Sequence, residues 1–109
     1  MKTSELSGAA LDWAVAKCEN RNFKLIESFL DYYDEGEMRY STDWAQGGPI
    51  IGKTNITIGP AHFSTSEYEA FTKYGNKALY GQTPLIAAMR CYVASILGDD
   101  VEIPKELTQ

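Results

Sequence analysis

The periodic pattern of residues along the chain is clearest between Thr83 and Gly98, where it predicts a helix. Thr83 suits the residue before a helix, Pro84 suits its first position, and Gly98 suits the residue that ends it. Large apolar residues recur on one side at a spacing of about 3.6 residues, and small residues occupy the other. The large side holds Leu85, Ile86, Met89, Tyr92, Val93, Ile96 and Leu97, and the small side holds Ala87, Ala88, Cys91, Ala94 and Ser95. We expect a sheet and a second helix to cover these two sides.

A second helix is predicted from Ser4 or Ser7 to about Glu19, because either serine can cap its first turn. Its larger apolar positions are Leu11, Val15 and Cys18. Glycine and alanine fill many of the remaining positions, and such a thin helix can approach another helix closely. We therefore expect it to pack on the small side of the 83–98 helix. The same small side could instead bind a second copy of the chain, which predicts a homodimer through the 83–98 helix.

Strands are predicted in the middle of the chain. Residues 56–58 read as a short strand that Gly59-Pro60 ends. Residues 67–74 and 77–80 read as the two arms of a β-hairpin with an aromatic face, since Gly75-Asn76 between them favours a tight turn. The hairpin leads directly into the predicted 83–98 helix, so this helix can fold back over the sheet.

Two segments have a less regular pattern. Residues 23–33 fit neither period cleanly, so they could form a helix or a strand. Residues 99–109 form a polar C-terminal tail with a short strand-like stretch at 101–103 that Pro104 ends. Taken together, the elements predict one α+β domain over residues 1–109. In it, a small antiparallel sheet with a hairpin packs against two or three helices in a helix/sheet/helix sandwich.

Length and charge narrow the possible partners. A chain of 109 residues has the size of one domain. Its net charge of −5 and pI of about 4.8 argue against nucleic acid, because the ten Lys and Arg residues are scattered rather than clustered. No apolar run approaches the roughly 18 residues that span a bilayer, and the N-terminus lacks the apolar core of a signal peptide. We expect a cytoplasmic protein that binds neither nucleic acid nor membrane.

The reactive side chains suggest no catalytic or metal site. Cys18 and Cys91 lie among apolar residues of predicted helices, which suits buried thiols better than a disulfide. His62 is the only histidine, and no activated serine or cysteine accompanies it. Two distant cysteines and one histidine do not form a recognisable zinc ligand set. We expect no cofactor and no metal.

The acidic run from Asp31 to Glu37 resembles a calcium loop only superficially. A loop starting at Asp31 places Gly36 correctly at its sixth position, but it places Tyr33 at the third and Thr42 at the twelfth. Neither residue is the acidic ligand that those positions need. We interpret the run as a solvated acidic loop.

The least generic stretch is 40–51, with the sequence YSTDWAQGGPII. Ser41, Thr42 or Asp43 can cap a short helix that carries Trp44, and Gly47-Gly48-Pro49 is expected to interrupt that helix. Adjacent glycines also indicate a backbone that is approached closely, either by a ligand or by another part of the chain. The candidate binding residues are Tyr40, Thr42, Asp43, Trp44, Gln46, Gly47, Gly48 and Arg90. A purely structural interpretation also stands, with the polar residues as caps or ion pairs and Trp44 in the core.

Residues 47–54, GGPIIGKT, match the consensus of a phosphate-binding P-loop. That loop needs a buried strand before it and a helix after it, so that successive N–H groups point at phosphate. Here residues 38–43 are polar, and residues 55–60 alternate like a strand. Pro49 also removes one N–H donor. We interpret the match as a coincidence.

Three blocks carry a family resemblance. Residues 6–18, 40–51 and 83–95 together resemble the NinX-like family of bacteriophage proteins. The resemblance implies an accessory protein, encoded by a phage or prophage, that acts in the cytoplasm of the bacterial host. It also implies a likeness to phage proteins built as alpha-beta-alpha sandwiches. It implies no biochemical activity, because the function of the family is unknown.

The residues leave three functions open. The first is a non-catalytic binding module for a small nucleotide-like ligand, which a glycine-rich and aromatic segment suits. The second is a module that binds a host protein through the acidic surface and the tyrosines. The third is a small hydrolase or nucleotide-processing enzyme that uses Asp43 or Asp12.

Overall fold

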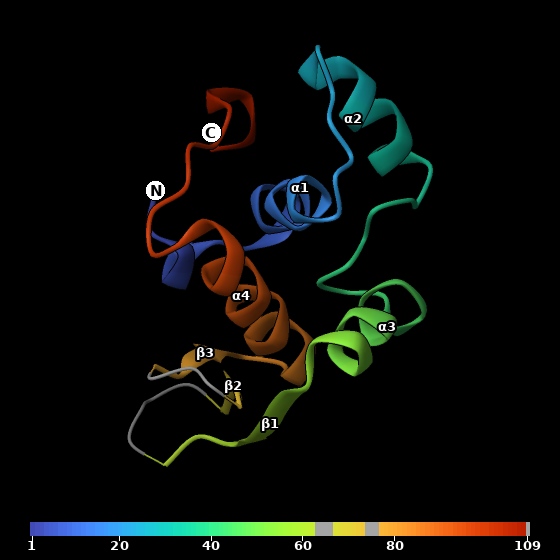
Figure 1. The fold of residues 1–109 in the computed structure, drawn as a ribbon. Coiled ribbons are helices and arrows are strands. Elements are labelled where there is room, and N and C mark those ends of the chain that lie inside the picture. Colours follow the sequence, from blue (N-terminus) through green and yellow to red (C-terminus); the bar gives the residue numbers. More distant parts are fainter. Residues whose placement is uncertain (63–66, 74–76, 109) are drawn as a thin grey trace.

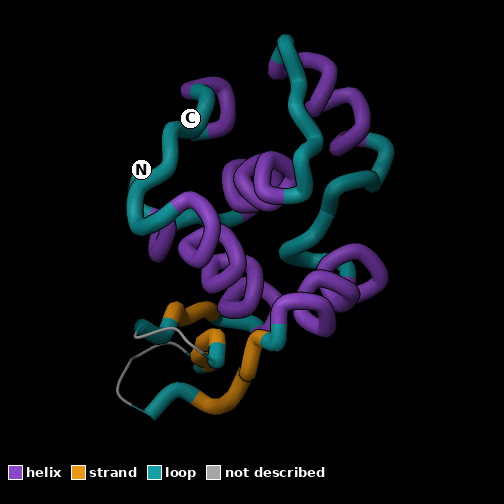
Figure 2. Tube along the Cα trace, viewed as in Figure 1, coloured by secondary structure: helices purple, strands orange, loops and turns teal. Residues whose placement is uncertain are grey.

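The computed structural model describes residues 1–62, 67–73 and 77–108. Within these ranges the helices are α1 (Gly8–Cys18), α2 (Ile26–Asp34), α3 (Trp44–Thr54) and α4 (Pro84–Leu97). The strands are β1 (Ile56–Pro60), β2 (Tyr68–Thr72) and β3 (Leu79–Gly81), and short 3-10 helices cover Thr3–Glu5 and Lys105–Leu107. The helices gather on one side of the molecule and the strands on the other (Figures 1 and 2).

Helix α4 is confirmed as the central element. The Thr83 hydroxyl accepts a hydrogen bond of 3.1 Å from the Ile86 N–H, Pro84 is the first helical residue, and Gly98 follows the last with a φ of +86°. A positive φ strains any residue with a side chain, so glycine suits this end. Helix α4 contacts all three strands, α1 and α3, and every layer of the fold therefore meets it.

The sheet is antiparallel in the order β1-β2-β3. Ile58 pairs with Ala70, and Ala70 pairs with Leu79, which aligns apolar side chains on the face that α4 covers. The predicted hairpin is confirmed in its two arms, while its turn at Gly75-Asn76 lies outside the described residues. The α+β class is also confirmed, with the layers in the order sheet, α4, α1 (Figure 1).

The small side of α4 packs on the sheet, and the expectation that α1 covers it is wrong. A Cβ placed on Gly81 of β3 would lie only 2.6 Å from the Ala87 nitrogen. Cys91 and Ala94 line a pocket together with Thr72 of β2. A sheet is flatter than a helix, so small side chains bring α4 close to it along its length. Ala87 and Cys91 are buried within a single chain, whereas Ser95 and Ile96 of the same helix are exposed. The homodimer through the 83–98 helix stays a prediction.

The large side of α4 packs against the other helices. The Tyr92 hydroxyl donates a hydrogen bond to the Glu19 carboxylate just beyond α1. The Leu85 side chain lies against α3, where a Cβ on Gly47 would be 2.8 Å from its Cδ1 atom. Large side chains on this side therefore fill the space between α4 and the neighbouring helices.

Most of the segment 23–33, which fits neither period cleanly, forms a helix. Helix α2 begins at Ile26, and its Phe29 is buried. The Phe29 ring stacks on Tyr33 at a centroid distance of 5.4 Å and meets the edge of Phe23 at 5.8 Å. Ile26, Leu30 and Tyr33 also pack against the core on the same side as Phe29, so an apolar stripe and these aromatic contacts together hold the short helix in place.

Ser7 precedes α1 as expected, although its side chain makes no capping hydrogen bond.

The two ends of the chain pair with each other. Met1 and Val101 exchange two backbone hydrogen bonds, of 3.0 and 2.9 Å. The strand-like interpretation of 101–103 is wrong, because the pairing is confined to an isolated bridge between Lys2 and Asp100. In the described part of the chain, no helix is long and apolar enough to cross a membrane.

Candidate functional site

The Gln46 side chain braces the loop between α2 and α3. Its Oε1 atom accepts a hydrogen bond of 2.9 Å from the Arg39 N–H. Its Nε2 atom donates to the Gly36 carbonyl at 2.8 Å and to the Asp43 carboxylate at 2.9 Å. One amide side chain therefore joins three points of the loop and holds it against the first turn of α3.

Asp43 is the residue that caps α3, of the three that the sequence allowed. Its Oδ1 atom accepts the Ala45 N–H at 3.0 Å, and its Oδ2 atom accepts the Gln46 amide. A carboxylate at this position satisfies a backbone donor that the helix leaves unpaired, and its negative charge interacts favourably with the positive end of the helix dipole. Both Asp43 oxygens are thus engaged inside the chain.

The Gly47-Gly48-Pro49 stretch does not interrupt the helix, contrary to the sequence prediction. Helix α3 runs from Trp44 to Thr54 with Pro49 inside it, and Asn55 ends it with a φ of 55°. Gly47 is approached closely by the chain itself, because a Cβ there would lie 2.2 Å from the Tyr40 carbonyl oxygen. The glycine thus leaves room for the Tyr40 carbonyl, and α3 continues across a proline and two glycines, residues that weaken a helix.

The stretch that matches a P-loop is consequently not a loop. Residues 47–54 lie within α3, and β1 follows them instead of a helix. The Lys53 ammonium forms an ion pair of 2.8 Å with the Glu19 carboxylate. Its side chain therefore joins α3 to the end of α1, and the backbone N–H groups of the stretch point along a helix axis.

Asp12 is a buried carboxylate that our list of binding residues omitted. Its Oδ1 atom accepts the Ser41 N–H at 2.8 Å, while its Oδ2 atom and the Ser41 hydroxyl are buried and meet no hydrogen-bond partner among the described residues. Burial raises the pKa of Asp12, although Ser41, the Tyr33 hydroxyl and the Arg39 charge oppose the shift. An acid within the apolar run from Leu11 to Val15 was the available signal in the sequence.

Arg39 and Arg90 have different partners. The Arg39 guanidinium lies 3.8 Å from the Tyr33 ring centroid and donates two hydrogen bonds to the Tyr33 carbonyl. Its positive charge stabilises the C-terminal end of α2, where the helix dipole is negative. Arg90 donates to the carbonyls of Leu6 and Tyr80, both at 2.7 Å, and burial lowers its pKa. Arg90 therefore joins α4 to the N-terminal segment and to β3, rather than to residues 40–48.

Trp44 does not belong to the core. Its side chain is 55% exposed on the first turn of α3, whereas Tyr40 is buried. Thr42 is exposed as well. Apart from Arg90, the structure thus divides the candidate residues into those that build the loop and the start of α3, and two, Thr42 and Trp44, whose side chains are exposed.

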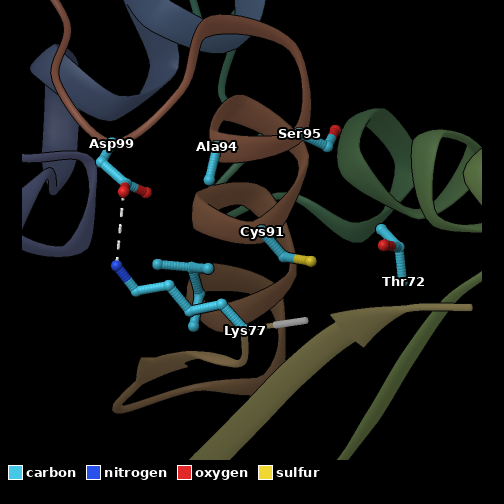
Figure 3. Close-up of a pocket in the computed structure, with 7 residues that line it drawn as sticks. Thr72, Lys77, Cys91, Ala94, Ser95 and Asp99 are labelled. Atoms are coloured by element: carbon cyan, nitrogen blue, oxygen red, sulfur yellow. Dashed lines mark ion pairs between the residues drawn. The ribbon is translucent and has the colours of Figure 1, made fainter. Parts of the chain in front are cut away.

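The pockets lie elsewhere on the molecule. Figure 3 shows one of about 180 Å³ between α4 and the sheet, with an ion pair of 3.4 Å between Lys77 and Asp99. Burial raises the pKa of its Cys91 thiol to about 11, so the thiol is neutral at pH 7. This volume is below the roughly 300 Å³ at which ligand sites usually begin. Four larger pockets, of about 260 to 500 Å³, are also lined by residues outside 40–48.

Over the residues that the structure describes, no group of three or more His, Cys, Asp or Glu side chains is placed to hold a metal ion.

Comparison with known proteins identifies the family. No curated protein matches the chain. A family model described as Bacteriophage P22, NinX matches residues 2–96, which is most of the chain. The matched range includes the described helices and strands up to Ile96 of α4, and it leaves out only Leu97 and the C-terminal 3-10 helix among them. The chain therefore belongs to the NinX family of bacteriophage proteins.

Proposed function

We propose that this phage protein is a non-catalytic binding module that acts on another protein in the cytoplasm of the infected bacterium. The observation that carries the proposal is the exposure of Trp44 on a segment that the chain itself holds rigid. Tryptophan is among the residues that most often supply binding energy at protein interfaces, because it buries a large apolar area and retains an N–H donor.

Rigidity of the surrounding loop favours this role. The Gln46 amide and the Asp43 cap fix the backbone on both sides of Trp44. A partner that covers the indole ring would therefore pay little entropy for ordering the loop. Tyr32 on α2 is also 45% exposed, so a second aromatic side chain is available near the same loop.

The other two functions receive less support from the geometry. A nucleotide-like ligand needs a concave pocket with polar side chains that face it. Asp43 and Gln46 instead bond within the chain, and Gly47 is covered by the Tyr40 carbonyl. An enzyme that used Asp12 would need access to a carboxylate that is fully buried.

The experiment is capture of bacterial proteins on the immobilised wild type, on Trp44→Ala and on Ile96→Ala. Ile96 is a matched control because it is 51% exposed, on α4. We expect the same partner on the wild type and on Ile96→Ala and its loss from Trp44→Ala, with melting temperatures within a few degrees of each other.

Two results would contradict the proposal. One is an unchanged set of partners on Trp44→Ala. The other is a small molecule that co-purifies with the wild type in native mass spectrometry and disappears in Trp44→Ala, which would instead support the nucleotide-like ligand.

A further inference from the structure

All of the net charge of the chain arises from one segment. Residues 27–43 contain six acids and one base, which gives −5, the net charge of the whole chain. Elsewhere nine acids and nine bases cancel. The six acids are Glu27, Asp31, Asp34, Glu35, Glu37 and Asp43. The single base, Arg39, has its guanidinium on the Tyr33 ring and carbonyl.

This segment lies beside Trp44. The bond from Gln46 to the Gly36 carbonyl brings Glu35 and Glu37, which flank Gly36, to the start of α3. Figure 1 shows α2 at the end of the molecule that is remote from the sheet, with this loop running from α2 to α3. We call the surface formed by Asp31, Tyr32, Glu35 and Glu37, which the Gln46–Gly36 bond ties to the start of α3, the acidic aromatic surface.

A pocket on this surface has the chemistry of a cation site. Its volume is about 320 Å³, and its lining is Ser28, Asp31, Tyr32 and Glu35. It combines an aromatic ring with two carboxylates, and a guanidinium or an ammonium can interact with both. Asp31 and Glu35 are four residues apart, so their like charges repel each other across one turn. In the described part of the chain, the ion pairs formed by Lys53, His62 and Lys77 involve other acids.

We infer that the partner of this surface is a protein segment in which an Arg or Lys enters the Asp31–Tyr32–Glu35 pocket while an apolar side chain covers Trp44. The inference rests on the proposed function and adds the chemistry of the partner. Charge complementarity supports it, since a positive residue relieves the repulsion in the pocket and the −5 segment attracts positive surfaces from a distance.

The test is a titration of ¹⁵N-labelled protein with a 12-residue peptide of repeated Arg-Ala-Leu. The comparison peptide has citrulline, a neutral isostere, in place of each arginine. We expect shifts in the amide signals of residues 31–37 and in the Trp44 indole signal, with binding at least about ten-fold weaker for the citrulline peptide. Raising the salt from 50 to 500 mM should also weaken binding of the arginine peptide, because exposed charge pairs are screened.

Two double variants with equal charge change locate the site. Asp31→Asn with Glu35→Gln should weaken arginine-peptide binding about ten-fold. Glu102→Gln with Glu106→Gln, at exposed acids of the C-terminal segment, should change it by less than two-fold. Equal losses in both variants would indicate attraction to net charge alone and would overturn the inference. Equal binding of both peptides, or no shift in residues 31–37, would overturn it as well.

Failure of this inference can be separated from failure of the proposed function. If Asp31→Asn with Glu35→Gln captures the bacterial partner as well as the wild type does, while Trp44→Ala loses it, the protein-binding function stands and the basic partner is wrong. If Trp44→Ala retains the partner, the proposed function itself fails.

Discussion

The Ser41 N–H donates a hydrogen bond of 2.8 Å to the buried carboxylate of Asp12, and this bond joins the loop before α3 to the middle of α1. The two residues are 29 positions apart in the chain. The bond thus anchors the segment that carries Trp44 to the helical core.

Asp12 should make stability depend on pH. Burial raises its pKa, so the folded state binds a proton more readily than the unfolded state does. Stability from this group is therefore fully present below the unfolded value of 3.8 and falls as pH rises through the folded pKa. Asp12→Asn keeps an acceptor for Ser41 without the charge, so we expect a higher melting temperature at pH 7 and a flatter profile above pH 4.

Asp12→Ala is the control for that experiment. It leaves the Ser41 N–H buried without an acceptor, and we expect a loss of about 1–3 kcal/mol in the free energy of unfolding. Thermal unfolding between pH 4 and 8 measures all three proteins. A wild-type profile that rises over this range with no change in Asp12→Asn would contradict the assignment.

Gly47 and Gly48 should respond oppositely to alanine. A Cβ at Gly47 would lie 2.2 Å from the Tyr40 carbonyl oxygen, so Gly47→Ala must displace backbone and should destabilise by about 3 kcal/mol. A Cβ at Gly48 would meet only the Trp44 ring at 3.7 Å, which is an ordinary contact. Gly48→Ala should stabilise α3 by about 0.5–1 kcal/mol through helix propensity. Urea unfolding of both variants measures the difference, and equal effects would show that the close approach is absent.

Gln46 should control the rigidity of the loop. Gln46→Ala removes the bonds to Arg39, Gly36 and Asp43. We expect faster amide hydrogen exchange at residues 36–39, and a loss of about 1–3 kcal/mol in stability. The amides of α4 should still exchange more slowly or more rapidly than those of the other helices and strands in the same ranking as in the wild type. Unchanged exchange at Arg39, whose N–H donates to Gln46, would rule out the bracing role.

Lys53 and Tyr92 share the Glu19 carboxylate but should differ in effect. The Lys53 ion pair is half exposed, so Lys53→Met should change stability by less than about 1 kcal/mol. The Tyr92 hydroxyl bonds Glu19 beside the core, and Tyr92→Phe should cost about 1–2 kcal/mol. Chemical denaturation compares the two. ATP binding that depended on Lys53 would contradict the structural role and revive the P-loop interpretation.

Local sequence determined the features whose partners lie within a few residues. The ends of α4 follow from Thr83, Pro84 and Gly98, and the arms of the hairpin follow from alternation and turn residues. A cap before Trp44 belongs to the same class, since the Asp43 acceptor meets an N–H only two residues later, although the sequence did not choose Asp43 over Ser41 and Thr42. Backbone geometry limits such contacts to a few arrangements, so residue types alone predict them.

Tertiary structure decided the features that depend on distant partners. Helix α3 continues across Gly-Gly-Pro with Gly47 close against the Tyr40 carbonyl, and Arg90 bonds carbonyls of the N-terminal segment and of β3 instead of joining the 40–48 segment. The exposure of Trp44 was equally hidden, because its residue type favours burial. These outcomes follow from how whole elements fill space around α4, and the periodicity of any one segment carries no record of that packing.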